Sequence, residues 1–210
     1  MFKKLPLGLL LISPFSALAH PHAFIDMQTK PLVKDNQLIG FSTQWLLDEA
    51  SSSAVLYDVK QAKGDKAAQQ KLVDEVIANV VNEHYFSYVF DKENHKIKYT
   101  KHPENYGMRV KGNEVEYYFD FLLAQPQALQ NNEFTLMTYD RTYYVAMRYA
   151  ETGKRAVDFS SLPANCKGEV LEPNVDEKIQ SYASSLDKSQ KNEDDSLGAL
   201  FAQKVKIKCE

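Results

Sequence analysis

The chain has 210 residues and carries 25 lysines and arginines against 28 aspartates and glutamates, a formal net charge of −3. This length suits one domain with its own hydrophobic core, and the slightly acidic balance excludes charge-driven binding to nucleic acid or to anionic lipid. Beyond the N-terminal region no segment holds the roughly 20 apolar residues that a membrane-spanning helix requires, so we expect a soluble protein without stable membrane insertion.

The first residues have the organisation of a secretory signal peptide. Lys3 and Lys4 precede a short apolar stretch at 5–15, and Ala17 and Ala19 form a small-x-small cleavage site. The apolar stretch is too short to cross a bilayer. We predict a signal peptide over residues 1–19, a mature chain over 20–210 and export to the periplasm.

Hydrophobic periodicity and turn-forming residues predict the remaining elements in chain order. We expect a β-hairpin (22–33 and 38–47, around 34–36), two helices (50–58 and 67–85), a β-rich section (88–90, 96–100, 106–111, 114–123, 134–139, 143–149 and 155–159), a helix (175–186), a polar linker (187–195), a short helix (197–203) and a closing strand (205–209). The predicted fold class is α+β: a single domain in which an antiparallel β-sheet has helices packed on one face.

The two cysteines are Cys166 and Cys209. An even pair in an exported protein predicts a disulfide, which would attach the C-terminus to the body of the fold. Metal ligation by these cysteines is the alternative, although the sequence contains no CxxC motif and no histidine near either residue.

The predicted mature N-terminus begins His20-Pro21-His22 and offers three nitrogen ligands, the α-amine and two imidazoles. In a strand, residues 20 and 22 point to the same side about 6.6 Å apart, so both imidazoles can approach one ion. Pro21 has no N–H, which excludes the copper motif that requires a deprotonated amide at the second position. We predict a transition-metal site here, with a frayed, solvated N-terminus as the alternative.

Further ligands are expected from the second strand of the hairpin. A three-residue turn at 34–36 places Asp48 opposite His22, and a two-residue turn at 35–36 places Glu49 there. Imidazole and carboxylate ligands suit zinc, with nickel, cobalt and copper as alternatives. Asp48 could instead cap the helix that begins at Ala50.

One more carboxylate stands in the aromatic corner at 139–144. Asp140 is predicted either to form the turn with its side chain or to act as an outer metal ligand. Of the other histidines, we expect His95 and His102 to be solvated and His84 to be buried on the apolar face of the second helix. The sequence has no GxSxG motif, no glycine-rich phosphate loop and no catalytic Cys–His pair, so we predict that the protein is not an enzyme.

The ordered motifs at 20–26 (HPHAFID), 45–49 (WLLDE), 139–144 (YDRTYY) and 201–209 (FAQKVKIKC), together with Cys166, carry a resemblance. The chain resembles the ZevA-like family of exported proteins, periplasmic components of transport systems encoded beside nickel/cobalt-type permeases. The resemblance implies zinc acquisition or delivery with an inner-membrane, ZevB-like permease, and it implies no ligand set.

Two alternatives to zinc binding remain open at this point. The first is a copper enzyme with an N-terminal histidine brace, which would need a third histidine such as His84 or His102. The second is a permease-docking subunit without its own metal site. The predicted ligand set is His20, His22, Asp48 and Asp140, and the predicted cargo is zinc.

Overall fold

The computed structural model of the chain describes residues 21–150, 156–185 and 196–210. The predicted signal peptide (1–19), the predicted ligand His20 and the predicted linker at 187–195 lie outside these residues. No helix in the described ranges is long and apolar enough to span a membrane.

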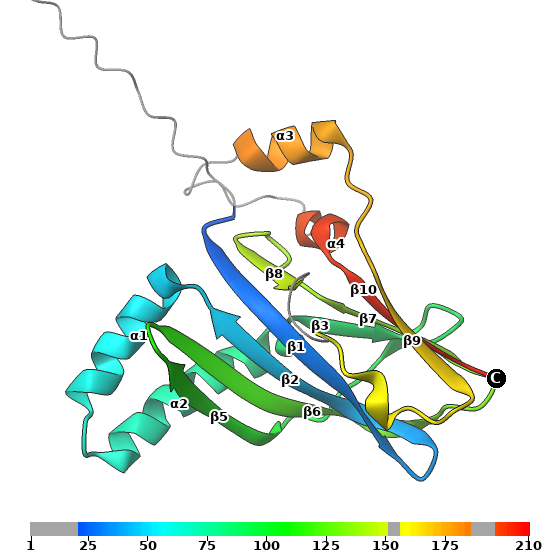
Figure 1. The fold of residues 1–210 in the computed structure, drawn as a ribbon, viewed down its shortest axis with the longest axis horizontal. Coiled ribbons are helices and arrows are strands. Elements are labelled where there is room, and N and C mark those ends of the chain that lie inside the picture. Colours follow the sequence, from blue (N-terminus) through cyan, green and yellow to red (C-terminus); the bar gives the residue numbers. More distant parts are fainter. Residues whose placement is uncertain (1–20, 151–155, 186–195) are drawn as a thin grey trace, which may run out of the picture.

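The first sheet contains the predicted hairpin and has the strand order β5-β6-β2-β1-β8 (Figure 1). Its strands are β1 (Ala23–Lys34), β2 (Gln37–Leu47), β5 (Glu104–Lys111), β6 (Glu114–Ala128) and β8 (Val145–Tyr149). All neighbours are antiparallel except β1 and β8, which run parallel. As a result, the start of β8 lies beside the start of β1, where Ala23 pairs with Val145.

The second sheet has the order β4-β3-β7-β10-β9. Its strands are β3 (Ser87–Phe90), β4 (Lys96–Ile97), β7 (Glu133–Thr138), β9 (Cys166–Leu171) and β10 (Lys204–Cys209). Cys166 and Cys209 face each other across β9 and β10 and form the predicted disulfide.

The strand predicted at 155–159 is wrong in its described part, and β9 was not predicted. Val157 makes only an isolated bridge to Thr29, and a 3₁₀ turn (Phe159–Ser161) follows. The reason is local, because the Asp158 side chain accepts the Ser160 N–H at 2.9 Å and caps that turn.

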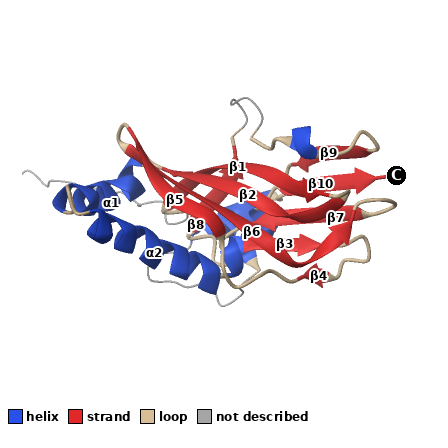
Figure 2. Ribbon diagram, turned by 90° about the horizontal axis from the view of Figure 1, so that it is seen from below, coloured by secondary structure: helices blue, strands red, loops and turns tan. Residues whose placement is uncertain are grey.

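Helices α1 (Glu49–Gln61) and α2 (Lys66–Asn82) lie together at one end of the first sheet (Figures 1 and 2). Each begins at an aspartate whose side chain accepts backbone N–H groups, Asp48 for α1 and Asp65 for α2. Two shorter helices, α3 (Glu177–Ser185) and α4 (Leu197–Phe201), lie together at another end of the molecule (Figure 1).

One hydrophobic core joins the two sheets and α2. Its buried side chains come from the first sheet (Phe41, Trp45, Phe119, Phe121), the second sheet (Val89, Phe134, Leu136, Ile207) and one face of α2 (Val73, Ile77, Val80). The α+β class, the antiparallel strands and the disulfide are therefore confirmed, and the structure divides the strands between two packed sheets.

The end of α2 differs from its prediction. The helix ends at Asn82, and the next residues include three in the left-handed region, His84 (φ 54°), Tyr85 (58°) and Phe86 (48°). This turn places the Tyr85 ring in the core, stacked 5.3 Å from the Phe121 ring. His84 is consequently exposed, and its prediction as a buried residue of the helix face is wrong.

Candidate metal centre

The described residues of the predicted ligand set lie around the first residues of β1. The His22 N–H donates to the Tyr144 carbonyl at 2.9 Å, and the two rings are 4.8 Å apart. Asp48 lies on the β2 side of this strand, and Asp140 belongs to the corner that leads into β8 on the other side. Strand β1, which begins just after His22, thus lies between β2 and β8, and each of these two strands has one of the carboxylates at the end nearest the start of β1.

Neither Asp48 nor Glu49 lies opposite His22, so both predicted pairings at this end of the hairpin are wrong. Ile25 pairs with Leu47, and Asp48 lies beside Phe24. The turn uses only Asp35 and Asn36, and one extra residue of β2 bulges where the register shifts. Together these features move β2 by one or two positions along β1 relative to the two predicted pairings.

Both carboxylate oxygens of Asp48 accept backbone N–H groups. Oδ2 accepts from Phe24 at 2.6 Å and Oδ1 accepts from Ser51 at 2.6 Å, so one side chain caps α1 and holds the start of β1. Burial opposes ionisation, but the hydrogen bonds from Ser51 and Phe24 outweigh it and hold the pKa of Asp48 below its usual value of 3.8. The predicted capping role of Asp48 is confirmed.

We expect Asp48→Ala to lower the free energy of unfolding by about 1–3 kcal/mol, because a cap and a second backbone acceptor are lost. Asp48→Asn should lose less, since its amide oxygen can still accept the Ser51 N–H. The carboxylate has a lowered pKa in the folded state, so its contribution is present above pH 3.8 and declines as the pH falls further. Urea unfolding at several pH values measures both effects.

The matched control is Asp65→Ala, which removes the cap of α2, where one oxygen accepts from Ala67 and Ala68 at 3.0 Å. This variant should lower the free energy of unfolding by about 1 kcal/mol, because only one helix cap is lost. An Asp48→Ala variant as stable as the natural chain at pH 7 would contradict the double role of this carboxylate.

Asp140 forms the corner between β7 and β8 with its side chain. Oδ1 accepts the Thr142 N–H at 3.1 Å, and Oδ2 accepts the Val145 N–H at 3.0 Å. The Thr142 hydroxyl lies 3.1 Å from both oxygens. This confirms the turn-forming role, which fixes β8 beside the start of β1.

Outside the predicted set, the turn between β3 and β4 gathers Asp91, Glu93 and His95. Their ligand atoms lie within 4.8 Å of one another. Among the described residues, no other group of three or more histidine, cysteine, aspartate or glutamate side chains has this spacing. His22, Asp48 and Asp140 do not form a set at that spacing. The spacing D-x-E-x-H in a polar turn was the available sequence signal for this group. His95 is exposed, as predicted, and its Nδ1 lies 3.3 Å from Asp91 Oδ2.

His102 lies in the loop before β5 and is exposed, as predicted. Its backbone carbonyl accepts a hydrogen bond from the Thr100 hydroxyl at 3.1 Å. Neither His84 nor His102 belongs to the candidate metal-binding group of the β3–β4 turn.

These observations define a two-sheet α+β protein with one disulfide and with candidate metal ligands at the start of β1. The chain belongs to the family described as "Protein of unknown function (DUF1007)", whose model matches residues 5–209. It is also similar to an uncharacterized protein of Haemophilus influenzae, 63% identical over 207 residues, which covers 99% of this chain and 98% of that protein. No solved structure matches the chain. The disulfide fits an exported protein.

Proposed function

We propose that this protein is a periplasmic zinc-binding accessory protein that works with an inner-membrane permease. One observation carries the proposal: the fold holds the backbone around His22 from both sides, through the Asp48 carboxylate on Phe24 and the Tyr144 carbonyl on His22. The residue that the sequence predicts as a metal ligand is thereby fixed next to the predicted mature N-terminus. The ZevA-like resemblance supplies the permease, of the nickel/cobalt type, as the partner.

The chemistry of these groups suits a site from which a metal can be passed on. The α-amine and imidazole of His20 and the imidazole of His22 supply up to three nitrogen ligands, and zinc binds four groups in its usual tetrahedral sites. The fourth position would then hold water or a ligand of the permease. Asp48 and Asp140 already accept backbone hydrogen bonds, so in this proposal their role is to fix the backbone on either side of the first residues of β1 and to add negative charge to that end of the sheet.

The zinc affinity of four proteins tests this proposal. We expect His22→Ala to bind zinc at least tenfold more weakly than the chain that begins at His20, equivalent to about 1.4 kcal/mol or more. A glycine added before His20 should also weaken binding, because the α-amine moves away from the imidazoles. Competition with a chromophoric chelator measures each affinity.

His95→Ala is the matched control, because it removes an imidazole from the other candidate group and should leave zinc affinity unchanged. If His95→Ala loses zinc and His22→Ala does not, the zinc site belongs to the β3–β4 turn. If no variant differs from the natural chain, the protein is better described as a permease-docking subunit. Tight copper binding with a three-nitrogen, T-shaped spectroscopic signature would favour the copper enzyme.

A second measurement addresses the permease. Zinc uptake by cells that carry the permease should fall to the level of cells without this protein when His22→Ala replaces the natural chain. Unchanged uptake together with lost zinc affinity would separate metal binding from the transport role.

A further inference from the structure

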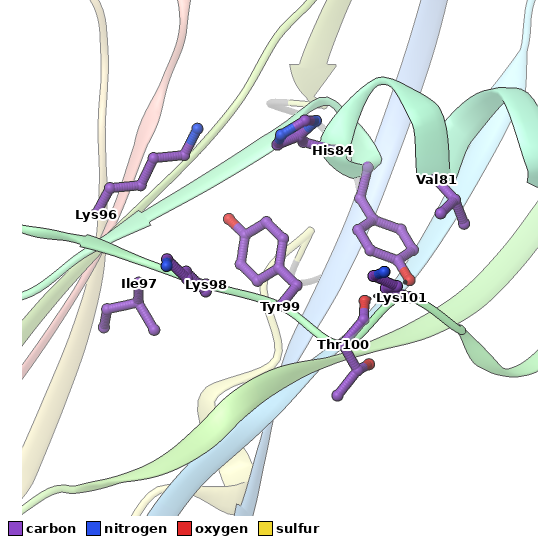
Figure 3. Close-up of a pocket in the computed structure, with 9 residues that line it drawn as sticks. Val81, His84, Lys96, Ile97, Lys98, Tyr99, Thr100 and Lys101 are labelled. Carbon is purple, nitrogen blue, oxygen red and sulfur yellow. Dashed lines mark hydrogen bonds between the residues drawn. The ribbon is translucent and has the colours of Figure 1, made fainter.

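A cavity of about 520 Å³ opens between the end of α2 and the segment that contains β4 (Figure 3). Its volume is within the range of small-molecule sites, about 300–1,000 Å³. The candidate zinc ligands His22, Asp48 and Asp140 do not line it. The cavity is therefore a separate feature of the fold, and its lining indicates what it could bind.

The charged side chains of this lining are all basic. His84 comes from the left-handed turn after α2, and Lys96, Lys98 and Lys101 come from one continuous segment (Figure 3). No acidic side chain of the described residues lines the cavity. The described structure shows no ion pair for any of the three lysines, although the chain as a whole is acidic.

Among these basic groups, Lys96 is the one whose charge the surroundings disfavour. Lys96 already contacts the Tyr88 ring, with Nζ 4.4 Å from the ring centroid. Burial, and then the nearby Arg141 guanidinium, lower the pKa of Lys96. A bound anion would offset both effects, since it supplies the opposite charge that the protein does not place there.

The walls of the cavity are apolar. Val81, Ile97, Tyr85 and Tyr99 line the cavity together with the basic side chains. The tyrosine hydroxyls have protein partners, because Tyr85 donates to the Thr100 carbonyl at 3.3 Å and Tyr99 donates to the Ser87 carbonyl at 2.7 Å. The polar side-chain groups left to face a ligand are then chiefly the cationic ones.

The backbone at this edge is also unusual. His84, Tyr85 and Phe86 all have positive φ, a conformation that costs a non-glycine residue roughly 1–2 kcal/mol. The turn inserts Tyr85 into the core and leaves His84 at the cavity rim. Strained backbone of this kind is concentrated at binding sites, where the fold stabilises it from elsewhere.

We propose that this cavity binds a small anionic amphiphile, a compact phosphate or carboxylate head on an apolar body. The head lies among His84, Lys96, Lys98 and Lys101, and the body contacts Val81, Ile97 and Tyr99. Both parts are required, because the basic groups select the charge and the apolar walls select the body. The site is independent of the proposed zinc site.

Calorimetric titration with four soluble probes tests this proposal on the chain that begins at His20, freed of zinc by a chelator that is dialysed away before the titration so that neither zinc nor the chelator's carboxylates interfere. Phenyl phosphate and benzoate carry the two possible heads on an apolar ring, and both should bind. Inorganic phosphate lacks the body and benzyl alcohol lacks the charge, so each should bind at least tenfold more weakly than phenyl phosphate. The probe with the higher affinity, phenyl phosphate or benzoate, identifies the preferred head group.

A double variant, Lys98→Gln with Lys101→Gln, should weaken phenyl phosphate binding at least tenfold. The matched control is Lys34→Gln with Lys60→Gln, which removes the same charge from exposed positions elsewhere and should leave binding unchanged. Thermal unfolding should be alike in all three proteins, because the four lysines are exposed. Equal binding by both double variants, equal binding of inorganic and phenyl phosphate, or no binding of phenyl phosphate or benzoate would overturn the proposal.

Discussion

A variant in which Cys166 and Cys209 are both replaced by serine is expected to lose about 2–4 kcal/mol of unfolding free energy. The disulfide joins residues 43 positions apart and connects the start of β9 to the end of β10. Without it the unfolded chain gains the conformations that the closed loop forbids. Urea unfolding under oxidising conditions measures the difference.

Two comparisons make this test specific to the disulfide. The natural chain treated with a reductant should unfold at the same urea concentration as the serine variant, because both lack the cross-link. Zinc affinity should not change, since neither sulfur is a proposed ligand. Free thiols in the protein isolated from cells without a reductant, or an unchanged unfolding midpoint, would count against this account.

Asp140→Ala is expected to lower the free energy of unfolding by about 2–3 kcal/mol, because the Thr142 and Val145 N–H groups lose their acceptor. The corner has little room to rearrange, because α4 packs against it: the Gly198 N–H donates to the Arg141 carbonyl at 3.1 Å, and a Cβ at Gly198 would overlap the Asp140 carbonyl oxygen. Weakening should therefore spread to β8 and to the start of β1.

Hydrogen exchange locates this effect, because the amides of Val145 and His22 should exchange faster in Asp140→Ala. Thr142→Val is the matched control, since it removes the hydroxyl contacts with the Asp140 carboxylate at 3.1 Å and with the Tyr144 N–H at 3.3 Å, and it keeps the two backbone N–H groups that donate to Asp140. It should lose less than half as much stability. An Asp140→Ala variant with normal stability would show that other groups hold the corner.

The candidate site illustrates how far local patterns reach. Asp48 before a helical sequence predicted a cap, and Asp140 between strands predicted a turn. Both roles are confirmed. They could be predicted because the hydrogen bonds involved join each side chain to N–H groups only two to five residues away, which requires only local geometry. The contact of Asp48 with Phe24 was not predicted, since it depends on a bulge beside Gly40 that the predicted pairing of the two strands did not include, although a glycine inside a strand often marks a bulge.

Features decided by distant contacts could not be predicted from local patterns. The helical stripe of α2 favoured a buried His84, but the core had room for the Tyr85 ring, and the chain adopts a left-handed turn to place it there. Lys96 and Lys98 alternate like the lysines of any exposed strand, and Lys101 follows three residues later. Only the packing of α2 against this segment turns them into the rim of a cavity.

The sequence by itself determined the α+β class, the first hairpin, the Cys166–Cys209 pairing, the helix cap at Asp48 and the turn at Asp140. Each of these depends on periodicity, on local capping and turn chemistry, or on the presence of two cysteines. The tertiary structure decided the division into two sheets, the register of β1 with β2, and the parallel contact that brings Tyr144 to His22. Those features depend on which strands reach the core together, and the free energy of that burial is shared among residues far apart in the chain.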